Sequence, residues 1–296
     1  METMITYALI AGIFGLFFGS FAGATVWRLR ARQLVTDKKA GEKINNKELH
    51  KLTPLTKETL ATDRSRCLHC NHTLAWYDLI PLVSWASTAG KCRYCRKPIG
   101  LFEPTIEIGT AVIFFLTTHF IAQTHQGSGV LLLVWLAISL GLVILVAYDA
   151  KWFLLPDVIM MPLLGLAIVV SLLDILSHSD VLHAALNCFG SVMLLGGLYF
   201  ILYSYSRWRF GEDKTWVGFG DVKLGLVLGL LLGDWQLAFI ALFAANAIGV
   251  IVVLPSLMTK KLSMTARVPF GPLLIIGFFI ALFFGHTIID WYQALV

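Results

Sequence analysis

The sequence predicts an all-α polytopic membrane protein with about eight transmembrane helices and one small polar segment between the first two. Three observations lead to this fold class. Hydrophobic residues make up 57% of the 296 residues, only 14% are charged, and the mean hydropathy is +0.77. Apolar runs long enough to cross a bilayer recur along the chain. The only long polar segment contains four of the five cysteines.

The apolar runs define eight expected spans. The first run is preceded by Glu2 rather than by basic residues and lacks a processing site, so we expect a retained helix rather than a cleavable signal peptide. The sixth run is too short for a full crossing, and we expect a half-helix or a merger with its neighbour. The spans lie at roughly 4–27, 105–123, 130–148, 154–176, 182–204, 222–232, 235–256 and 269–289.

The basic residues predict the orientation. All 23 lysines and arginines fall on the same predicted side of the eight spans. They lie between Arg28 and Lys97, at Lys151, from Arg207 to Lys223, and from Lys260 to Arg267. Because basic loops stay in the cytoplasm, this side is predicted to be cytoplasmic and both termini to lie outside.

This topology divides the chain into three expected parts. Residues 1–28 form the first transmembrane helix, residues 29–104 a cytoplasmic segment, and residues 105–296 a multi-helix membrane domain. The first part of the cytoplasmic segment, Ala31 to Arg66, is rich in Lys, Thr, Asn and Glu and has few aromatic residues. That composition predicts a flexible surface region.

Four cysteines of the cytoplasmic segment have the spacing of a zinc ribbon, with two Cys-x-x-Cys pairs. Four thiolates complete a closed tetrahedron around Zn²⁺, so residues 67–95 are expected to hold a structural zinc ion. Two disulfides are the alternative, which a reducing cytoplasm disfavours; His69 or His72 could also serve as ligands, and Cys188 is expected in core packing. The predicted ligands are Cys67, Cys70, Cys92 and Cys95.

The polar segment is basic, with 15 lysines and arginines from Arg28 to Lys97. Basic zinc ribbons can bind nucleic acid. Topology and attraction to anionic lipid head groups already explain the excess in a membrane-bound segment. We therefore expect membrane lipid, and no nucleic acid, as a partner.

Two carboxylates at expected helix ends suggest catalysis. Asp149 follows an unbroken apolar run, and Asp221 follows Gly218 and Gly220, which permit a tight turn. Carboxylates inside an apolar chain are functional candidates by default. Each aspartate alone could also be an interfacial cap or pair with Lys151 or Lys223.

Together, the two aspartates could form an acid–base dyad. Two carboxylates about 4 Å apart repel by roughly 4 kcal/mol at an effective dielectric near 20, so one proton would be shared. Helix dipoles favour an ionised Asp221 at a helix start and a protonated Asp149 at a helix end. Asp157 has a structural explanation, because it follows Pro156 at a helix N-terminus.

At this point the chain resembles the type IV prepilin peptidases, which are bifunctional membrane enzymes of pilus and type II secretion systems. The resemblance extends in order over most of the chain. The motifs that carry it are Gly19-Ser20-Phe21 with Arg28, Ser65-Arg66-Cys67, Trp76-Tyr77-Asp78 with Pro81, Ser84-Trp85, Gly90-Lys91-Cys92, Glu107, Asp149 with Leu155-Pro156-Asp157, Gly218 to Lys223, and Pro269-Phe270-Gly271-Pro272.

The resemblance implies an aspartic endopeptidase of the bacterial inner membrane with Asp149 and Asp221 as the catalytic pair. Gly218, Gly220 and Lys223 would belong to the supporting loop. The substrate would be a prepilin or pseudopilin, cut at the cytoplasmic face between a short basic leader and a hydrophobic helix. The family also methylates the new N-terminus from S-adenosylmethionine, a function tied to the cytoplasmic segment. No loop in the sequence identifies residues that bind the methyl donor.

Other functions stay open at this point. The enzyme could be a peptidase without methyltransferase activity. A non-catalytic zinc-ribbon membrane adaptor would need no aspartate pair. A proton-coupled transporter would use intramembrane carboxylates, usually at the bilayer midplane and often within repeats, and no repeat is visible here.

Overall fold

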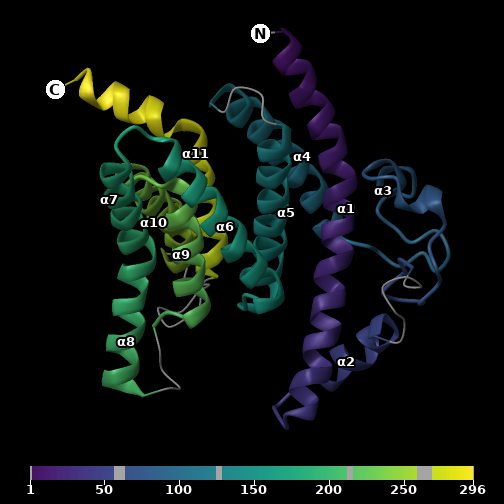
Figure 1. Ribbon diagram of the computed structural model, residues 1–296. Coiled ribbons are helices and arrows are strands. Elements are labelled where there is room, and N and C mark those ends of the chain that lie inside the picture. Colours follow the sequence, from purple (N-terminus) through teal and green to yellow (C-terminus); the bar gives the residue numbers. More distant parts are fainter. Residues whose placement is uncertain (1, 57–63, 125–128, 212–215, 259–268, 296) are drawn as a thin grey trace. The chain divides into compact units, whose positions relative to one another are not determined.

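The computed structural model describes residues 2–56, 64–124, 129–211, 216–258 and 269–295. These residues form helices joined by turns and contain no strand, only two isolated bridges in the polar segment (Figure 1). Lys214, Lys260, Lys261 and Arg267, which the orientation argument used, lie outside the described residues.

Eleven α-helices are described, together with two single-turn helices and one π-helical segment. They are α1 (Glu2–Lys39), α2 (Asn46–Leu52), η1 (Thr53–Thr56), η2 (Trp76–Leu79), α3 (Val83–Ser87), α4 (Phe102–Thr124), α5 (Gly129–Trp152), α6 (Asp157–Ser177), α7 (Val181–Val192), η3 (Met193–Gly197), α8 (Leu198–Phe210), α9 (Phe219–Leu232), α10 (Trp235–Met258) and α11 (Phe270–Gln293).

The predicted all-α membrane architecture is confirmed. Each expected span coincides with a helix, and the span at 182–204 is formed by α7, η3 and α8 in succession. Within the described residues, seven helices are long and apolar enough to cross a membrane. The eighth, α9, has 14 residues and is therefore about 21 Å long, shorter than a hydrocarbon core of about 30 Å.

The chain divides into two compact units, Met1–Ala147 and Tyr148–Val296, which we describe separately. In the first unit, α1 and α4 pack closely through small residues. A Cβ at Gly15 would lie 2.7 Å from the Cα of Ala111, and one at Gly19 would lie 2.6 Å from the Cα of Glu107. Such close backbone approach is typical of helix pairs in membranes, where van der Waals contact drives association.

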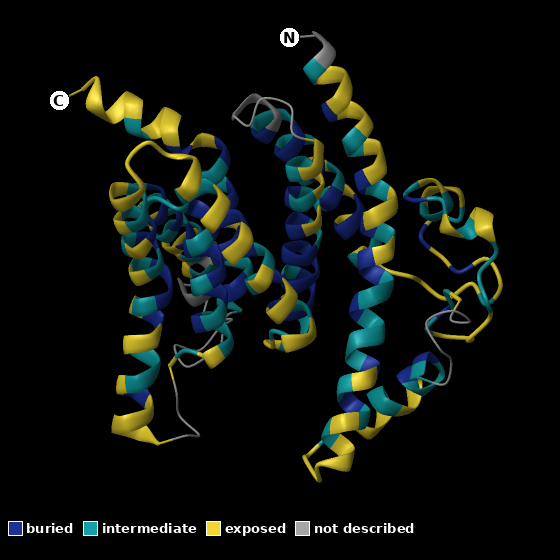
Figure 2. Ribbon diagram, viewed as in Figure 1, coloured by how far each residue is buried: buried dark blue, intermediate teal, exposed yellow. Residues whose placement is uncertain are grey.

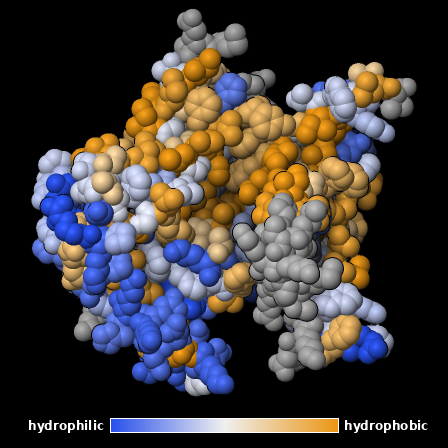
Figure 3. All heavy atoms as spheres, turned by 180° about the vertical axis from the view of Figure 1, so that it is seen from behind, coloured by the Kyte–Doolittle hydropathy of each residue, from blue (hydrophilic) through white to orange (hydrophobic). Residues whose placement is uncertain are grey.

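Large apolar side chains are exposed along α1, among them Phe14 and Phe17. Figure 2 shows exposed residues recurring along this helix. Apolar residues also dominate the helix surfaces in Figure 3, whereas hydrophilic residues gather at the polar segment and the nearby end of α1. Exposed apolar surface of this extent is expected to face lipid.

The prediction of a flexible region from Ala31 to Arg66 is wrong for residues 31–56, which are largely helical. Helix α1 continues to Lys39, and α2 and η1 fold back against it. Where α2 packs against α1, the Arg30 guanidinium forms an ion pair with the Glu48 carboxylate, with 2.9 Å between nitrogen and oxygen. The polar composition of residues 31–66 led to the wrong prediction, because it concealed a small apolar cluster formed by Ala31, Leu34, Leu52 and Leu55. Residues 57–63 lie outside the described residues.

In the second unit, the continuous rod of α7, η3 and α8 packs along α9. Glycines again make the contact: a Cβ at Gly229 would lie 2.8 Å from the Cα of Val192, and one at Gly225 would collide with the carbonyl oxygen of Leu195. The Ser191 hydroxyl donates to the carbonyl oxygen of Gly229 at 2.8 Å. This packing positions the N-terminal turn of α9, which carries Asp221.

Candidate aspartate site and cysteine cluster

Asp149 and Asp221 come near each other in the second unit. Asp149 lies in the last turn of α5 and is only 5% exposed. Asp221 lies in the first turn of α9 and is partly buried. The two carboxylates lie within the range at which their charges act on each other. The structure thus brings together the two aspartates that the sequence singled out.

The start of α11 completes the surroundings of Asp149. The backbone N–H of Gly271 donates to the Asp149 carboxylate. A Cβ at Gly271 would lie 2.7 Å from Oδ2 of Asp149, so a larger residue would displace that carboxylate. Leu155 packs against both glycines of this region, 3.6 Å from a Cβ at Gly271 and 3.2 Å from one at Gly220. The starts of α9 and α11 therefore converge beside Asp149.

Asp221 also caps its own helix. Its Oδ2 accepts the N–H of Gly218 at 3.2 Å, and its own N–H donates to the carbonyl oxygen of Gly218 at 3.1 Å. The local cap that the sequence left open as an alternative is thus present. It uses one carboxylate oxygen and leaves the other for further chemistry.

Lys223 pairs with a different aspartate. Its Nζ lies 2.7 Å from Oδ1 of Asp157, the first residue of α6. Its ammonium also lies 5.4 Å from the ring centre of Phe219. Asp157 follows Pro156 at the helix start as expected. Lys223 therefore connects the beginnings of α6 and α9, beside the aspartate pair.

The sequence reasoning missed Tyr199, a buried residue of α8. The negative charge of Asp221 acts on its phenol, and its ring lies 5.3 Å from the ring of Phe270. A tyrosine within an apolar run has no sequence pattern that indicates function. Its position relative to Asp221 becomes visible only once α8 is packed against α9.

The four predicted cysteine ligands come together in the first unit. Their Sγ atoms all lie within 4.8 Å of one another, and those of Cys67 and Cys95 are 3.9 Å apart. A tetrahedron with Zn–S distances of 2.3 Å has sulfurs about 3.8 Å apart, so the cluster fits such an ion. All five cysteines are free thiols, which argues against the disulfide alternative.

Other predicted or possible ligands lie elsewhere. His69 and His72 do not belong to the cluster, and the ring of His72 lies tilted against the ring of Tyr94, with the ring centres 3.7 Å apart. Cys188 is buried, with its sulfur 3.1 Å from the Ser171 hydroxyl, and serves core packing as expected.

The two Cys-x-x-Cys pairs have the same backbone geometry. In each, the fourth residue after the first cysteine has a positive φ and donates to that cysteine's carbonyl oxygen: Asn71 to Cys67 and Arg96 to Cys92, both at 2.9 Å. Burial raises the pKa of the Cys67 thiol to about 12. At Cys92 burial is outweighed by backbone N–H donors, which lower the pKa to about 7. A metal ion would favour the thiolate at all four positions.

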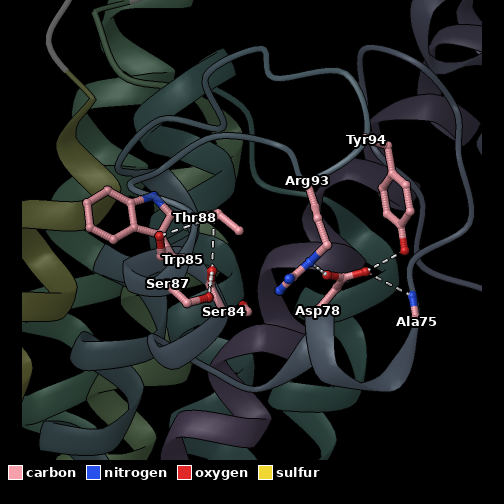
Figure 4. Close-up of polar contacts among 8 residues, drawn as sticks. All are labelled: Ala75, Asp78, Ser84, Trp85, Ser87, Thr88, Arg93 and Tyr94. Atoms are coloured by element: carbon pink, nitrogen blue, oxygen red, sulfur yellow. Dashed lines mark hydrogen bonds and ion pairs between the residues drawn. The ribbon is translucent and has the colours of Figure 1, made fainter.

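Polar contacts order the loop between the pairs (Figure 4). The Asp78 carboxylate accepts from Arg93 at 2.9 Å, from the Tyr94 hydroxyl at 2.9 Å and from the N–H of Ala75 at 3.2 Å. Burial would raise the Asp78 pKa, but these donors outweigh it and lower the pKa. The loop is therefore attached to the second cysteine pair.

Glu107 attaches the same loop to the membrane helices. It is 6% exposed, and its Oε2 accepts the N–H of Leu82 at 2.8 Å. The Ser20 side chain of α1 contacts the same carboxylate. Leu82 has a φ of +58°, an uncommon conformation for a γ-branched residue that this contact helps to hold. Glu107 thus joins α1, α4 and the polar segment between them.

Two family models match successive parts of the chain. The bacterial peptidase A24 N-terminal domain matches residues 13–121, and the type IV leader peptidase family matches residues 136–254. No solved structure matches the chain.

Three relatives carry the name prepilin leader peptidase/N-methyltransferase. The Pseudomonas aeruginosa protein is 30% identical over 97% of this chain and 94% of its own length. The Legionella pneumophila protein is 30% identical over 96% and 93%, and the Aeromonas hydrophila protein is 32% identical over 79% and 76%. The chain belongs to the type IV leader peptidase family.

Proposed function

We propose that the protein is a prepilin peptidase that removes the leader of a prepilin or pseudopilin with an aspartate dyad, Asp149 and Asp221. The observation that carries this proposal is the approach of Asp149, in the last turn of α5, to Asp221, in the first turn of α9, beside the start of α11. Both lie within the residues that match the leader peptidase family. The names of the relatives support the substrate class.

The dyad would supply a base and an acid for peptide hydrolysis. Two like charges this close favour the state in which the pair holds one proton. The ionised carboxylate removes a proton from water, whose oxygen attacks the scissile carbonyl carbon. The protonated carboxyl group donates to the carbonyl oxygen. Collapse of the tetrahedral intermediate breaks the C–N bond, and the leaving amine receives a proton from the dyad.

Gly218 leaves room for the substrate backbone beside the dyad, because it has no side chain and is exposed. Gly271 is buried, and its lack of a side chain gives the Asp149 carboxylate its space. The backbone N–H groups of Gly218 and Gly271 already face the two carboxylates. An extended substrate chain can approach such a surface closely, as a peptide bond must in order to reach both carboxylates.

A second activity, methylation of the new N-terminus, belongs in this proposal to the first unit. The leader peptidase match covers only residues 136–254, and the relatives carry the additional name N-methyltransferase. The first unit contains the cysteine cluster, which would hold a structural Zn²⁺ through Cys67, Cys70, Cys92 and Cys95. S-adenosylmethionine would supply the methyl group, and the N-terminal amine of the cut pilin would accept it.

The proposal also assigns the cleavage to the cytoplasmic face of the bacterial inner membrane. The basic residues carry this part of the argument. Membrane lipid would surround the exposed apolar helix faces, and no nucleic acid is expected as a partner. The membrane fold alone would also suit a proton-coupled transporter or a non-catalytic adaptor, and the match to the leader peptidase family favours the protease over both.

The decisive experiment is cleavage of a prepilin by the purified protein in detergent, read by mass spectrometry. Asp149→Asn and Asp221→Asn keep the side-chain shape, and each should lower the rate by about 10⁴-fold or more, as removal of one member of a catalytic group does. Asp290→Asn, in the exposed last turn of α11, is the control and should cleave normally. Normal cleavage by Asp149→Asn would remove the dyad from the mechanism.

The same spectra report methylation, because the mature pilin gains the mass of one methyl group when S-adenosylmethionine is present. Cleavage without this gain would identify a peptidase that lacks the second activity. No cleavage of any prepilin by the wild-type protein would favour the transporter or the adaptor.

A further inference from the structure

The rod of α7, η3 and α8 runs antiparallel to α9 in a regular register. Ser191 contacts Gly229 through a hydrogen bond of 2.8 Å. Four residues later on the rod, and four earlier on α9, Leu195 contacts Gly225. One further step of the same register pairs Tyr199 with Asp221. The side of the rod that makes two close contacts with glycines thus presents a tyrosine at the position of the aspartate.

The π-helical segment explains why this register holds. In a regular α-helix, residues four apart drift by about 40° per step around the axis. The wider turn of η3 (Met193–Gly197) reverses part of this drift and keeps Ser191, Leu195 and Tyr199 facing α9. Single π-turns inside α-helices are frequent at functional sites. The segment therefore directs Tyr199 toward the dyad.

Contacts beyond the register support this placement. The charge of Asp221 acts on the Tyr199 phenol. The Tyr199 ring packs on Phe270, and the next residue, Gly271, donates its N–H to Asp149. One turn further along α8, Tyr203 lies 5.3 Å from Phe219, so the helices stay in contact beyond Asp221. Tyr199 thus touches the elements that carry or contact both aspartates.

The hydroxyl of Tyr199 is open to a partner. Tyr199 is 5% exposed, no hydrogen bond joins its hydroxyl to another described residue, and this oxygen is not among the fully buried polar atoms that lack a partner. The hydroxyl of Tyr203, in contrast, accepts from Arg207 at 2.9 Å. A phenol O–H is a good hydrogen-bond donor, and buried tyrosines usually have a partner for it. A substrate oxygen would provide that partner.

We infer that Tyr199 is a further catalytic residue of the peptidase site, whose hydroxyl donates a hydrogen bond to the oxyanion of the tetrahedral intermediate. The inference rests on the proposed peptidase function. When water attacks, the π electrons of the carbonyl move to its oxygen, which then accepts hydrogen bonds from the protonated aspartate and from Tyr199. The tyrosine keeps its proton throughout, so it adds no step to the proton transfers of the dyad.

The test compares Tyr199→Phe with Tyr203→Phe, each of which removes one hydroxyl and keeps the ring. Loss of one donor to an oxyanion lowers kcat by about 10²–10³-fold, and we expect a loss near the lower end for Tyr199→Phe, with KM within twofold. Tyr203→Phe should match the wild type. A tetrahedral hydroxyl-containing substrate mimic should bind Tyr199→Phe more weakly by the same factor, while the cleaved leader peptide should bind equally well.

A kcat of Tyr199→Phe within twofold of the wild type, or an effect on KM alone, would overturn the inference. Methylation of a pre-cleaved pilin and the melting temperature monitor the fold. A second pair of variants tests the inference if Tyr199→Phe does not fold. Tyr199→His keeps a hydrogen-bond donor and should cleave prepilin faster than Tyr199→Leu at equal melting temperature. Equal cleavage rates of these two variants would overturn the inference. Failure of the wild type to cleave any prepilin would instead refute the proposed function.

Discussion

Among single residues, the two aspartates differ mainly in where they sit on their helices. Each carboxylate accepts one backbone N–H, from Gly271 at Asp149 and from Gly218 at Asp221. Asp149 is in the last turn of α5, where the helix dipole is negative, and Asp221 is in the first turn of α9, where it is positive. Lys223, two residues beyond Asp221, is neutralised by Asp157.

We therefore predict that Asp221 is the ionised partner that deprotonates water and that Asp149 carries the shared proton. Dipole interactions contribute about 0.3–1 kcal/mol at exposed helix ends and up to about 2 kcal/mol when partly buried, enough to order two like groups. A neutron structure with a bound transition-state mimic would locate the proton. A proton on Asp221 would reverse the two roles and leave the dyad itself in place.

For the helices, small residues set the distances. Gly225 and Gly229 let α9 approach the rod of α7, η3 and α8, and this contact holds the turn that carries Asp221. Overpacking at such a contact costs about 1–3 kcal/mol, because neighbouring backbone must move.

We predict that Gly225→Ala lowers the free energy of unfolding by at least this amount and slows prepilin cleavage. The new methyl group would collide with the carbonyl oxygen of Leu195. Gly165→Ala on α6 is the matched control: it is exposed, and nothing lies within 4 Å of its added Cβ. Thermal unfolding in detergent and cleavage rates measure both effects. Equal stability of the two variants would contradict the packing argument.

The positions of most helices were predictable from the sequence, and the exceptions have physical reasons. Uninterrupted apolar runs specify helices whatever their neighbours, so a helix lies at each of the eight expected positions, and seven of these helices are long enough to span a membrane. The extension of α1 to Lys39 was missed because its polar residues, such as Arg30, gain a partner only when α2 folds back. The position of Tyr199 opposite Asp221 was missed because it depends on the register of two helices and on a π-turn, neither of which leaves a local pattern.

The whole molecule separates its two proposed chemistries. The aspartates lie in the unit Tyr148–Val296, and the cysteine cluster lies in the unit Met1–Ala147. The cysteines, unlike Tyr199, were predictable because a metal site of four thiolates needs a fixed spacing along the chain. Four cysteine sulfurs would enclose a metal ion and leave no open coordination position for a substrate.

We predict that the purified protein contains about one zinc ion per chain, as expected for a closed four-cysteine site. Replacing Cys67 and Cys92 together by serine should remove the metal, increase hydrogen exchange between residues 64 and 100, and abolish methylation. Prepilin cleavage should persist at a rate within a few fold of the wild type. Cys188→Ser is the control for loss of a thiol and should retain the metal. A wild-type protein without metal would contradict this separation. So would a double variant that loses prepilin cleavage together with the metal.

The two attachments of the polar segment to α1 restrict how this segment can turn. The first is at Ser20, where Glu107 holds the N–H of Leu82, and the second is at Leu34, which packs with α2 and η1. Fourteen residues of helix separate them, which corresponds to about 21 Å. A body attached at one point can rotate in every direction, whereas one attached at two points can rotate only about the line that joins them. That line runs parallel to α1, so any swing of the segment would follow the membrane surface if α1 stands upright in the bilayer, and would leave its height above the lipid unchanged.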